Sequence, residues 1–344
     1  MAFALPKYLA AIAAVLSVSS PCLADVNIIG YQSVFADNYR KAVIEPFEKK
    51  TGIKVIYNEI NLSAQNLGRI RAEKNNPTLD LSIMDAMVSR AGNTEGIFDQ
   101  VDLTKLSNGQ NLFDEAYVNK GFGPGITFDY PVLMYSNSLS NPPKALADLA
   151  KPDLKGQVAM WPAPEIAALM NTILLTRAAG GDEKKSVDQG IEKFAEIAKN
   201  VQTWAPAPDA YELVSNGTVK AGAGWNARAQ FFANDPKSKM SVVIPTEGSM
   251  FQINTLNLVK GAPNKEEALK FIDFALSPEA QAAFANLMFY SPTNKDAKPS
   301  QDALSKTAST PEIREKLKPL DWAFFVSKRE SWLQEWRRKV ITAN

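Results

Sequence analysis

The residues best suited to hold a small polar molecule are an aromatic ring and an amide in succession, Trp225 and Asn226. They follow the run 222–224 (Gly-Ala-Gly), whose small side chains let the backbone approach a ligand closely. A tryptophan face attracts ammonium groups, and an amide both donates and accepts hydrogen bonds. This pair is the leading candidate for ligand contact, against the alternative that Trp225 is a core residue. Arg228 could clamp a carboxylate, although the sequence favours a solvated surface position for it.

Two further candidates are a carboxylate and a tyrosine. Asp85 follows a predicted strand over residues 79–84, where it either pairs with a ligand cation or caps the next helix. Tyr290 precedes the run 291–294 (SPTN) and is a candidate for the rim of a site. Ligands of open α/β sheets bind beyond the carboxyl ends of the strands, so strand ends are the positions to examine.

The composition removes most catalytic chemistry. The chain of 344 residues contains no His and one Cys, which excludes a Ser-His-Asp or Cys-His nucleophile and imidazole-ligated zinc. Lys and Arg total 38 against 37 Asp and Glu, so no basic field points to nucleic acid or an anionic membrane. No Walker-type phosphate loop occurs, and no pair of acids is spaced to indicate a hydrolase. We therefore expect neither catalysis nor a cofactor nor a metal site.

The N-terminus has the three parts of a secretory signal. Lys7 supplies positive charge, residues 8–18 form an apolar run, and Cys22-Leu23-Ala24 places small residues before a cleavage site ahead of Asp25. The run is too short to span a bilayer, and Pro21 argues against lipidation of Cys22. We expect a signal peptide over 1–24, cleaved after Ala24, and a mature chain without Cys, which suits an oxidising compartment.

The N-terminal third alternates strands and helices. A strand over 26–30, a helix over 37–50 and a strand over 53–57 form a βαβ unit, in which the strands should be parallel. Pro46 should kink or restart the helix, and Gly52 should cap it in the left-handed conformation. The alternation continues with a helix over 62–74 and a strand over 79–84. The chain is therefore of the α/β class.

The later elements suggest how the chain divides, and the length alone is typical of about two domains. Two long extended runs occupy 130–137 and 250–259, and a fresh strand-led unit begins at 153–161. Asn264 and Glu267 have the spacing of a capping box, and Ser277 followed by Pro278 should start another helix. We expect the C-terminal tryptophans to pack a last helix onto the body; they are Trp322, Trp332 and Trp336.

Four phrases resemble the periplasmic substrate-binding proteins of bacterial ABC importers, in the branch that binds polyamines, thiamine and ferric ion. They lie in the family's order over nearly the whole mature chain: 46–55 (PFEKKTGIKV), 217–226 (GTVKAGAGWN), 247–254 (EGSMFQIN), and 262–268 (APNKEEA) running to 276–280 (LSPEA). Each phrase is weak alone, but four in order after a signal peptide identify the superfamily. They specify the ligand much less closely.

The resemblance implies a two-lobed α/β clamshell of the type II periplasmic-binding-protein fold, hinged on crossing strands. Residues 25–136 and 258–344 would form lobe one, and residues 137–257 would form lobe two. The two extended runs, around 133–137 and 252–258, would be the crossings. A solute would bind between the lobes, which close over it by a hinge motion.

The same resemblance assigns roles to further residues. Tyr31 would stack on the ligand and Gln32 would hydrogen-bond to it, unless Tyr31 only packs the first turn. Glu165 would pair with an ammonium group, although an acid in a first helical turn also suits the helix dipole. Polyamine binders carry an Asp at the position of Asn254, so this chain retains hydrogen bonding there and loses a charge.

The implied function is the capture of a small nitrogen-containing, polyamine-like solute and its delivery to an inner-membrane permease driven by a separate ATPase. An amino-acid-type zwitterion, a thiamine-like cation, and a sensory ligand carrier remain alternatives. The expected partners are the solute and the permease, with no nucleic acid, and the protein would be a periplasmic monomer. Adjacent tyrosines of the ferric-ion branch are absent, so iron is disfavoured.

Overall fold

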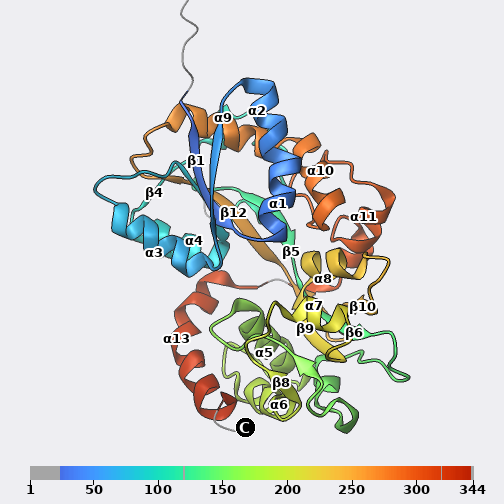
Figure 1. Ribbon diagram of the computed structural model, residues 1–344. Coiled ribbons are helices and arrows are strands. Elements are labelled where there is room, and N and C mark those ends of the chain that lie inside the picture. The colour runs from blue at the N-terminus through green and yellow to red at the C-terminus, as the bar shows by residue number, and fades with distance from the viewer. Residues whose placement is uncertain (1–23, 119–120, 319, 342–344) are drawn as a thin grey trace, which may run out of the picture.

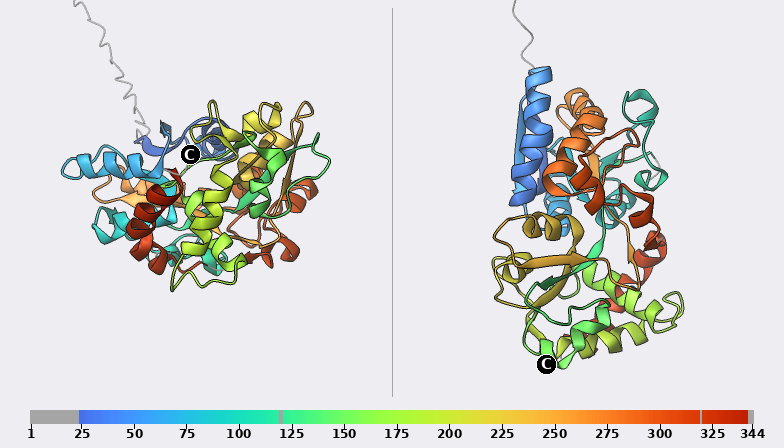
Figure 2. Two further views of the ribbon diagram at one scale, coloured as in Figure 1. Left: turned by 90° about the horizontal axis from the view of Figure 1, so that it is seen from below. Right: turned by 90° about the vertical axis from the view of Figure 1, so that its right-hand side faces the viewer.

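Most strands join one of two sheets, and each sheet is the centre of one lobe (Figure 1). The structure is a computed structural model that describes residues 24–118, 121–318 and 320–341. The expected signal peptide and most of its cleavage motif lie outside the described residues. We call the elements around the first sheet lobe one and those around the second sheet lobe two. Figure 2 shows the lobes one above the other in an elongated molecule.

The sheet of lobe one has the order β2-β1-β3-β12-β4, and β5 also pairs with β12. Its strands are β1 (Val26–Tyr31), β2 (Val55–Ile60), β3 (Leu81–Asp85), β4 (Phe98–Asp99), β5 (Gly125–Asp129) and β12 (Gln252–Val259). β1 is parallel to β2 and β3, which confirms the predicted βαβ unit, whereas β12 runs antiparallel to β3. The strand ends of β1 and β3 therefore meet the start of β12.

Helices cover both faces of this sheet. They are α1 (Val34–Tyr39), a π-helical segment (Arg40–Ile44), α2 (Glu45–Thr51), α3 (Ser63–Glu73), α4 (Ala86–Thr94), α9 (Lys265–Ala275), α10 (Pro278–Met288) and α11 (Gln301–Lys306). The π segment ends just before Pro46, the predicted point of irregularity, and Gly52 caps α2 with φ 75°. Ser277 caps α10 as predicted. The capping box at Asn264 is wrong, because its side-chain amide donates to Asp80 instead.

The sheet of lobe two has the order β10-β6-β9-β7-β8. Its strands are β6 (Pro131–Ser136), β7 (Val158–Ala159), β8 (Val201–Thr203), β9 (Ala221–Trp225) and β10 (Met240–Val243). Its helices are α5 (Ile166–Ala178), α6 (Asp188–Ala198), α7 (Ala210–Ser215), α8 (Asn226–Ala233) and α13 (Trp322–Lys339). The remaining short elements are β11 (Ser249–Met250), β13 (Leu317–Lys318), α12 (Pro311–Arg314) and 3-10 turns at Leu103–Lys105, Asp114–Ala116, Leu146–Ala150 and Pro152–Leu154.

The chain changes lobe at other residues than predicted. β5 ends at Asp129 and β6 begins at Pro131 in the other sheet, so the first crossing is at Tyr130 rather than at 136/137. The second crossing is at Phe251, between β11 and β12, rather than at 257/258. The predicted boundaries were wrong because each long extended run, 130–137 and 250–259, contains a crossing near its start and a strand of one lobe after it. The prediction placed the boundary near the end of that strand.

The C-terminal helix also belongs to the other lobe than predicted. α13 packs on α6, and its Trp332 and Trp336 join the core of lobe two. Figure 1 shows α13 beside α5 and α6, far from α9. The indole of Trp336 is fully buried and donates to Thr172 Oγ1 at 3.2 Å. The predicted packing of a tryptophan-bearing last helix is confirmed, and its assignment to lobe one is corrected. No helix among the described residues has the length and apolar character needed to cross a membrane.

Candidate functional site

Glu165 and Trp225 form a side-chain pair in lobe two. Glu165 is the N-cap of α5, where one carboxylate oxygen accepts from Ala167 N at 2.6 Å. The other carboxylate oxygen accepts the Trp225 indole N–H at 3.2 Å. Trp225 is in turn the N-cap of α8, and its backbone N–H donates to the Tyr211 hydroxyl at 2.8 Å. Both side chains are only partly buried, so a carboxylate and an aromatic face stand together at the start of two helices.

Asp85 and Tyr31 form the facing group in lobe one. Asp85 ends β3 and caps α4 by accepting from Val88 N at 2.9 Å, so the helix-capping alternative is correct. Ser63 links the two residues, because its hydroxyl contacts the Tyr31 hydroxyl at 2.9 Å and accepts from Asp85 N at 3.1 Å. Asp85 is 5% exposed and forms no ion pair with any described residue. Burial raises the pKa of this capping carboxyl group.

Asn254 lies beside this group in an uncharged hydrogen-bond network. Its Oδ1 accepts from the Tyr31 hydroxyl at 3.1 Å and from Gln252 Nε2 at 2.9 Å. Its Nδ2 donates to Thr127 Oγ1 at 3.0 Å. Since Asn254 pairs with Asp85 across the antiparallel strands, the amide sits next to the carboxylate in the sheet. The amide holds Tyr31 in place without adding charge.

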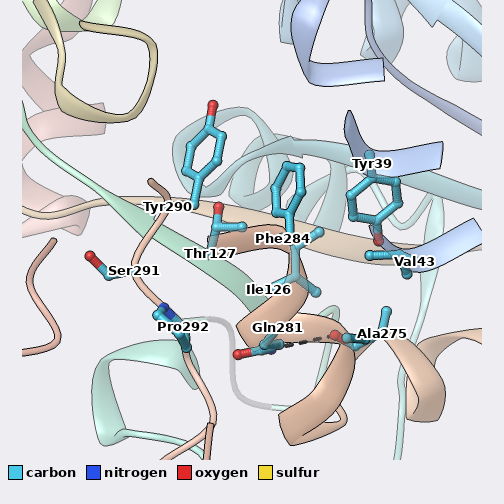
Figure 3. A pocket seen from close by; sticks show the side chains of 11 residues that line it. Tyr39, Val43, Ile126, Thr127, Ala275, Gln281, Phe284, Tyr290, Ser291 and Pro292 are labelled. Atoms are coloured by element: carbon cyan, nitrogen blue, oxygen red, sulfur yellow. Dashed lines mark hydrogen bonds between the residues drawn. The ribbon is translucent and has the colours of Figure 1, made fainter. Parts of the chain in front are cut away.

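Tyr290 joins the same region through aromatic packing. Its ring stacks on Phe284 at 5.3 Å and meets the edge of Phe35 at 5.7 Å, and Phe35 also contacts Tyr31 at 5.2 Å. Figure 3 shows the Tyr290 ring extending away from Gln281 at the wall of a small cavity in lobe one. That cavity has a volume of about 10 Å³, which suffices for about one water molecule and no solute.

Two charged residues complete the region. The sequence did not select Asp129, and it favoured a solvated surface position for Arg228 over a role as a carboxylate clamp. Asp129, at the end of β5 and 2% exposed, accepts from Tyr130 N at 2.9 Å and from Ala227 N at 3.0 Å. Arg228, on α8, is partly buried and interacts electrostatically with Tyr290. The expected solvated surface position for Arg228 is therefore wrong. An acid within the apolar run 125–135 was the signal that could have singled out Asp129.

The electrostatics of the region follow from burial. Burial, with a further contribution from the charge of Asp85, raises the pKa of Glu165 to about 7. The hydrogen bonds from the Ala167 N–H and the Trp225 indole oppose this rise. Burial also raises the pKa of Asp85, opposed by Ser63, Val88 N–H and the charge of Arg329. Burial raises the pKa of Asp129 to about 7, against backbone N–H groups and Arg228. Each carboxylate would be stabilised in its ionised form by a cation.

Asn226 and the glycines before Trp225 contact other parts of the protein, whereas the assignment of Gln32 to the ligand stays a prediction. The Asn226 amide is buried and donates to Lys306 O at 2.9 Å, so it ties α8 to the end of α11. Gln32 is exposed just after β1. The glycines before Trp225 make room for protein atoms, since a Cβ on Gly222 would lie 2.4 Å from Ala159 O and one on Gly224 2.7 Å from the Tyr211 ring. The structure therefore brings together Tyr31, Asp85, Glu165, Trp225, Asn254 and Tyr290.

The arrangement is suited to binding. Carboxylates, an arginine, aromatic rings and amides from both lobes face one region, and the chain crosses between the lobes beside it, at Tyr130 and Phe251. Within the described residues, no group of three or more Cys, Asp or Glu could hold a metal ion. Two α/β lobes with such a region between them define a binding protein of the clamshell class.

The chain belongs to the family of bacterial extracellular solute-binding proteins, whose match spans residues 42–313. A spermidine/putrescine-binding periplasmic protein of Salmonella typhimurium is 28% identical over 264 residues, covering 74% of this chain and 75% of that protein. A gamma-aminobutyric acid-binding protein of Pseudomonas aeruginosa is 23% identical over 287 residues, covering 78% of this chain and 77% of that protein. An ABC transporter substrate-binding protein from Bradyrhizobium japonicum has a TM-score of 0.78 at 20% identity, covering 92% of this chain and 99% of that one. The predicted family and two-lobed fold are confirmed.

Proposed function

We propose that this protein captures a small solute bearing an ammonium group between its lobes and delivers it to an ABC permease in the inner membrane. A separate ATPase powers the transport, and the protein itself catalyses no reaction. It acts as a monomer in the periplasm after removal of the signal peptide at Ala24. The lobes close over the solute by a hinge motion about the crossings of the chain, which include Tyr130 and Phe251.

The pairing of Glu165 with Trp225 carries this proposal. A partly buried carboxylate bonded to an indole, with no ion-pair partner among the described residues, is poised for a cation. The adjacent ring face adds roughly 0.5 to 2 kcal/mol for an ammonium group. Asp85 contributes a second carboxylate, whose charge acts on Glu165 from the other lobe. A bound ammonium would therefore join the two lobes electrostatically.

The names of the relatives agree with this chemistry. Spermidine, putrescine and gamma-aminobutyric acid differ in charge and length, but each carries an ammonium group. Asn254 weighs against the most highly charged of these solutes, because its amide leaves one position of the region uncharged. The ammonium group is thus the shared feature on which the proposal rests.

Thermal unfolding with a matched pair of solutes tests the proposal. We expect 1,4-diaminobutane or 4-aminobutyrate to raise the unfolding temperature and 1,4-butanediol, which lacks nitrogen, to have no effect. A ligand at 100 times its dissociation constant adds about 2.7 kcal/mol to stability, which such an assay detects readily. Trp225→Ala, which should weaken binding about 10-fold, should reduce this gain to roughly half, whereas Trp322→Phe, a tryptophan change on α13 outside the site, should preserve it. An equal response to the diol, or an unchanged response in Trp225→Ala, would refute the proposal.

A further inference from the structure

Arg228 is a cation in the binding region that lies outside every ion pair found among the described residues. The groups around it are the hydroxyls of Tyr290, Tyr211 and Tyr31, and burial keeps the pKa of each of these above its usual value. Neutral hydroxyls do not neutralise a guanidinium, so compensation of its charge depends on the carboxylates around it.

Two carboxylates act electrostatically on Arg228, and both accept hydrogen bonds from backbone N–H groups. The Oδ1 of Asp129 accepts two backbone N–H groups, one of them at the start of α8, and its pKa stays raised although Arg228 acts to lower it. Asp209, which also acts on Arg228, caps α7 by accepting from Glu212 N at 2.8 Å. A partly buried guanidinium in this setting is stabilised by an incoming anion, and a carboxylate matches its planar fork.

The cation lies close in sequence to the ammonium site. Arg228 is in the first turn of α8, three residues after Trp225, which is the N-cap of that helix. Trp225 in turn holds Glu165 at 3.2 Å. On the facing lobe, Tyr290 interacts electrostatically with Arg228, and Ser63 joins Tyr31 to the backbone of Asp85. Arg228 thus adds a positive charge to a region that also contains the carboxyl groups of Asp85 and Glu165.

We infer that the solute is an ω-amino acid, with its carboxylate held by Arg228 and its ammonium group by Glu165 and Asp85. The inference rests on the proposed function and narrows it. A diamine of the same length would place its second ammonium against Arg228. It would find at Asn254 an amide already engaged by Tyr31 and Gln252 instead of a compensating charge.

Isothermal titration of the mature protein with 4-aminobutyrate and with 1,4-diaminobutane tests this inference. The two probes share chain length and one ammonium group, and they differ in the charge at the other end. We expect 4-aminobutyrate to bind at least 10-fold more tightly. Arg228→Gln should weaken its binding by about 10- to 100-fold, the range for a hydrogen-bonded charge, and leave diamine binding equal or tighter. Arg228→Lys, which keeps the charge, should retain part of the preference.

The outcomes separate the two proposals. Tighter binding of 1,4-diaminobutane, or an equal loss of both probes in a folded Arg228→Gln protein, would overturn the ω-amino acid inference and leave the ammonium-binding function intact. Binding of neither probe would overturn the ammonium site itself, and the inference with it. Circular dichroism and the unfolding temperature of each variant show whether it is folded.

Discussion

The pKa of Glu165 makes the affinity for an ammonium solute depend on pH. Glu165 must be ionised to pair with an ammonium group, yet its pKa in the free protein is raised to about 7. Binding below that pH therefore requires the release of a proton, and the affinity should fall as the solution is acidified. Glu165→Gln removes the ionisation and should remove this dependence together with most of the affinity.

The size of the effect follows from the pKa. With a pKa of about 7, Glu165 is about 3% ionised at about pH 5.5 and about 90% ionised at about pH 8, so the affinity should differ by about 30-fold, or about 2 kcal/mol. The stability of the free protein should change in the opposite sense. Because the folded pKa lies above the unfolded value of 4.5, folding takes up a proton, and stability falls by up to about 3 kcal/mol as the pH rises from about 4.5 to about 7.

Calorimetry in two buffers of different ionisation enthalpy measures both the affinity and the number of protons released. We expect nearly one proton per ammonium bound at about pH 5.5 and almost none at about pH 8. Asp321→Asn is a matched control, since Asp321 caps α13 by accepting from Phe324 N at 3.0 Å outside the binding region. An affinity independent of pH in the unaltered protein, or an unchanged pH dependence in Glu165→Gln, would refute the reasoning.

Three further changes have defined outcomes. Trp225→Ala should lower the affinity for an ammonium probe by about 10-fold in calorimetry, within the range of a cation–π contact, and Trp225→Phe should lose less; equal affinities would contradict the role of the ring. Asn254→Asp should lower the free energy of unfolding by about 1–3 kcal/mol at about pH 8, because it buries a charge, and by less at about pH 5. Urea unfolding at the two pH values measures this difference, and equal losses would contradict the prediction. Trp336→Ala should lower the free energy of unfolding in urea by about 3–5 kcal/mol, because its indole is fully buried. Trp322 is partly exposed, so Trp322→Ala should cost less than half of that. Similar costs for the two variants would contradict the packing of α13.

Local patterns predicted the first half of lobe one well. The βαβ unit, the irregular helix before Pro46 and the left-handed cap at Gly52 all depend on residues close in sequence, and all are present. The lobe boundaries depend on which sheet a strand joins. The apolar runs around Tyr130 and Phe251 carry no such information, since a buried strand has the same composition in either sheet.

The candidate site was predicted where a strand or helix end alone positions the side chain. Asp85, Glu165 and Trp225 each follow a strand end or begin a helix, and the structure brings them toward one region. Asp129 was missed and Arg228 was expected at a solvated position, because their burial results from contact between α8, β5 and the segment at Tyr290. Asn226 was assigned to the ligand because an amide can hydrogen-bond equally well to a ligand or to another part of the protein. Its partner, Lys306 O, is distant in sequence and is seen only in the tertiary structure.

The first and last described elements belong to opposite lobes. β1 begins lobe one at Val26, whereas α13 ends on the core of lobe two near Val340 (Figure 1). A fluorophore attached at each of these two ends would therefore report the separation of the lobes directly. The natural order of the chain thus suits the protein for use as a genetically encoded optical sensor of its own solute, without any internal insertion or rearranged termini.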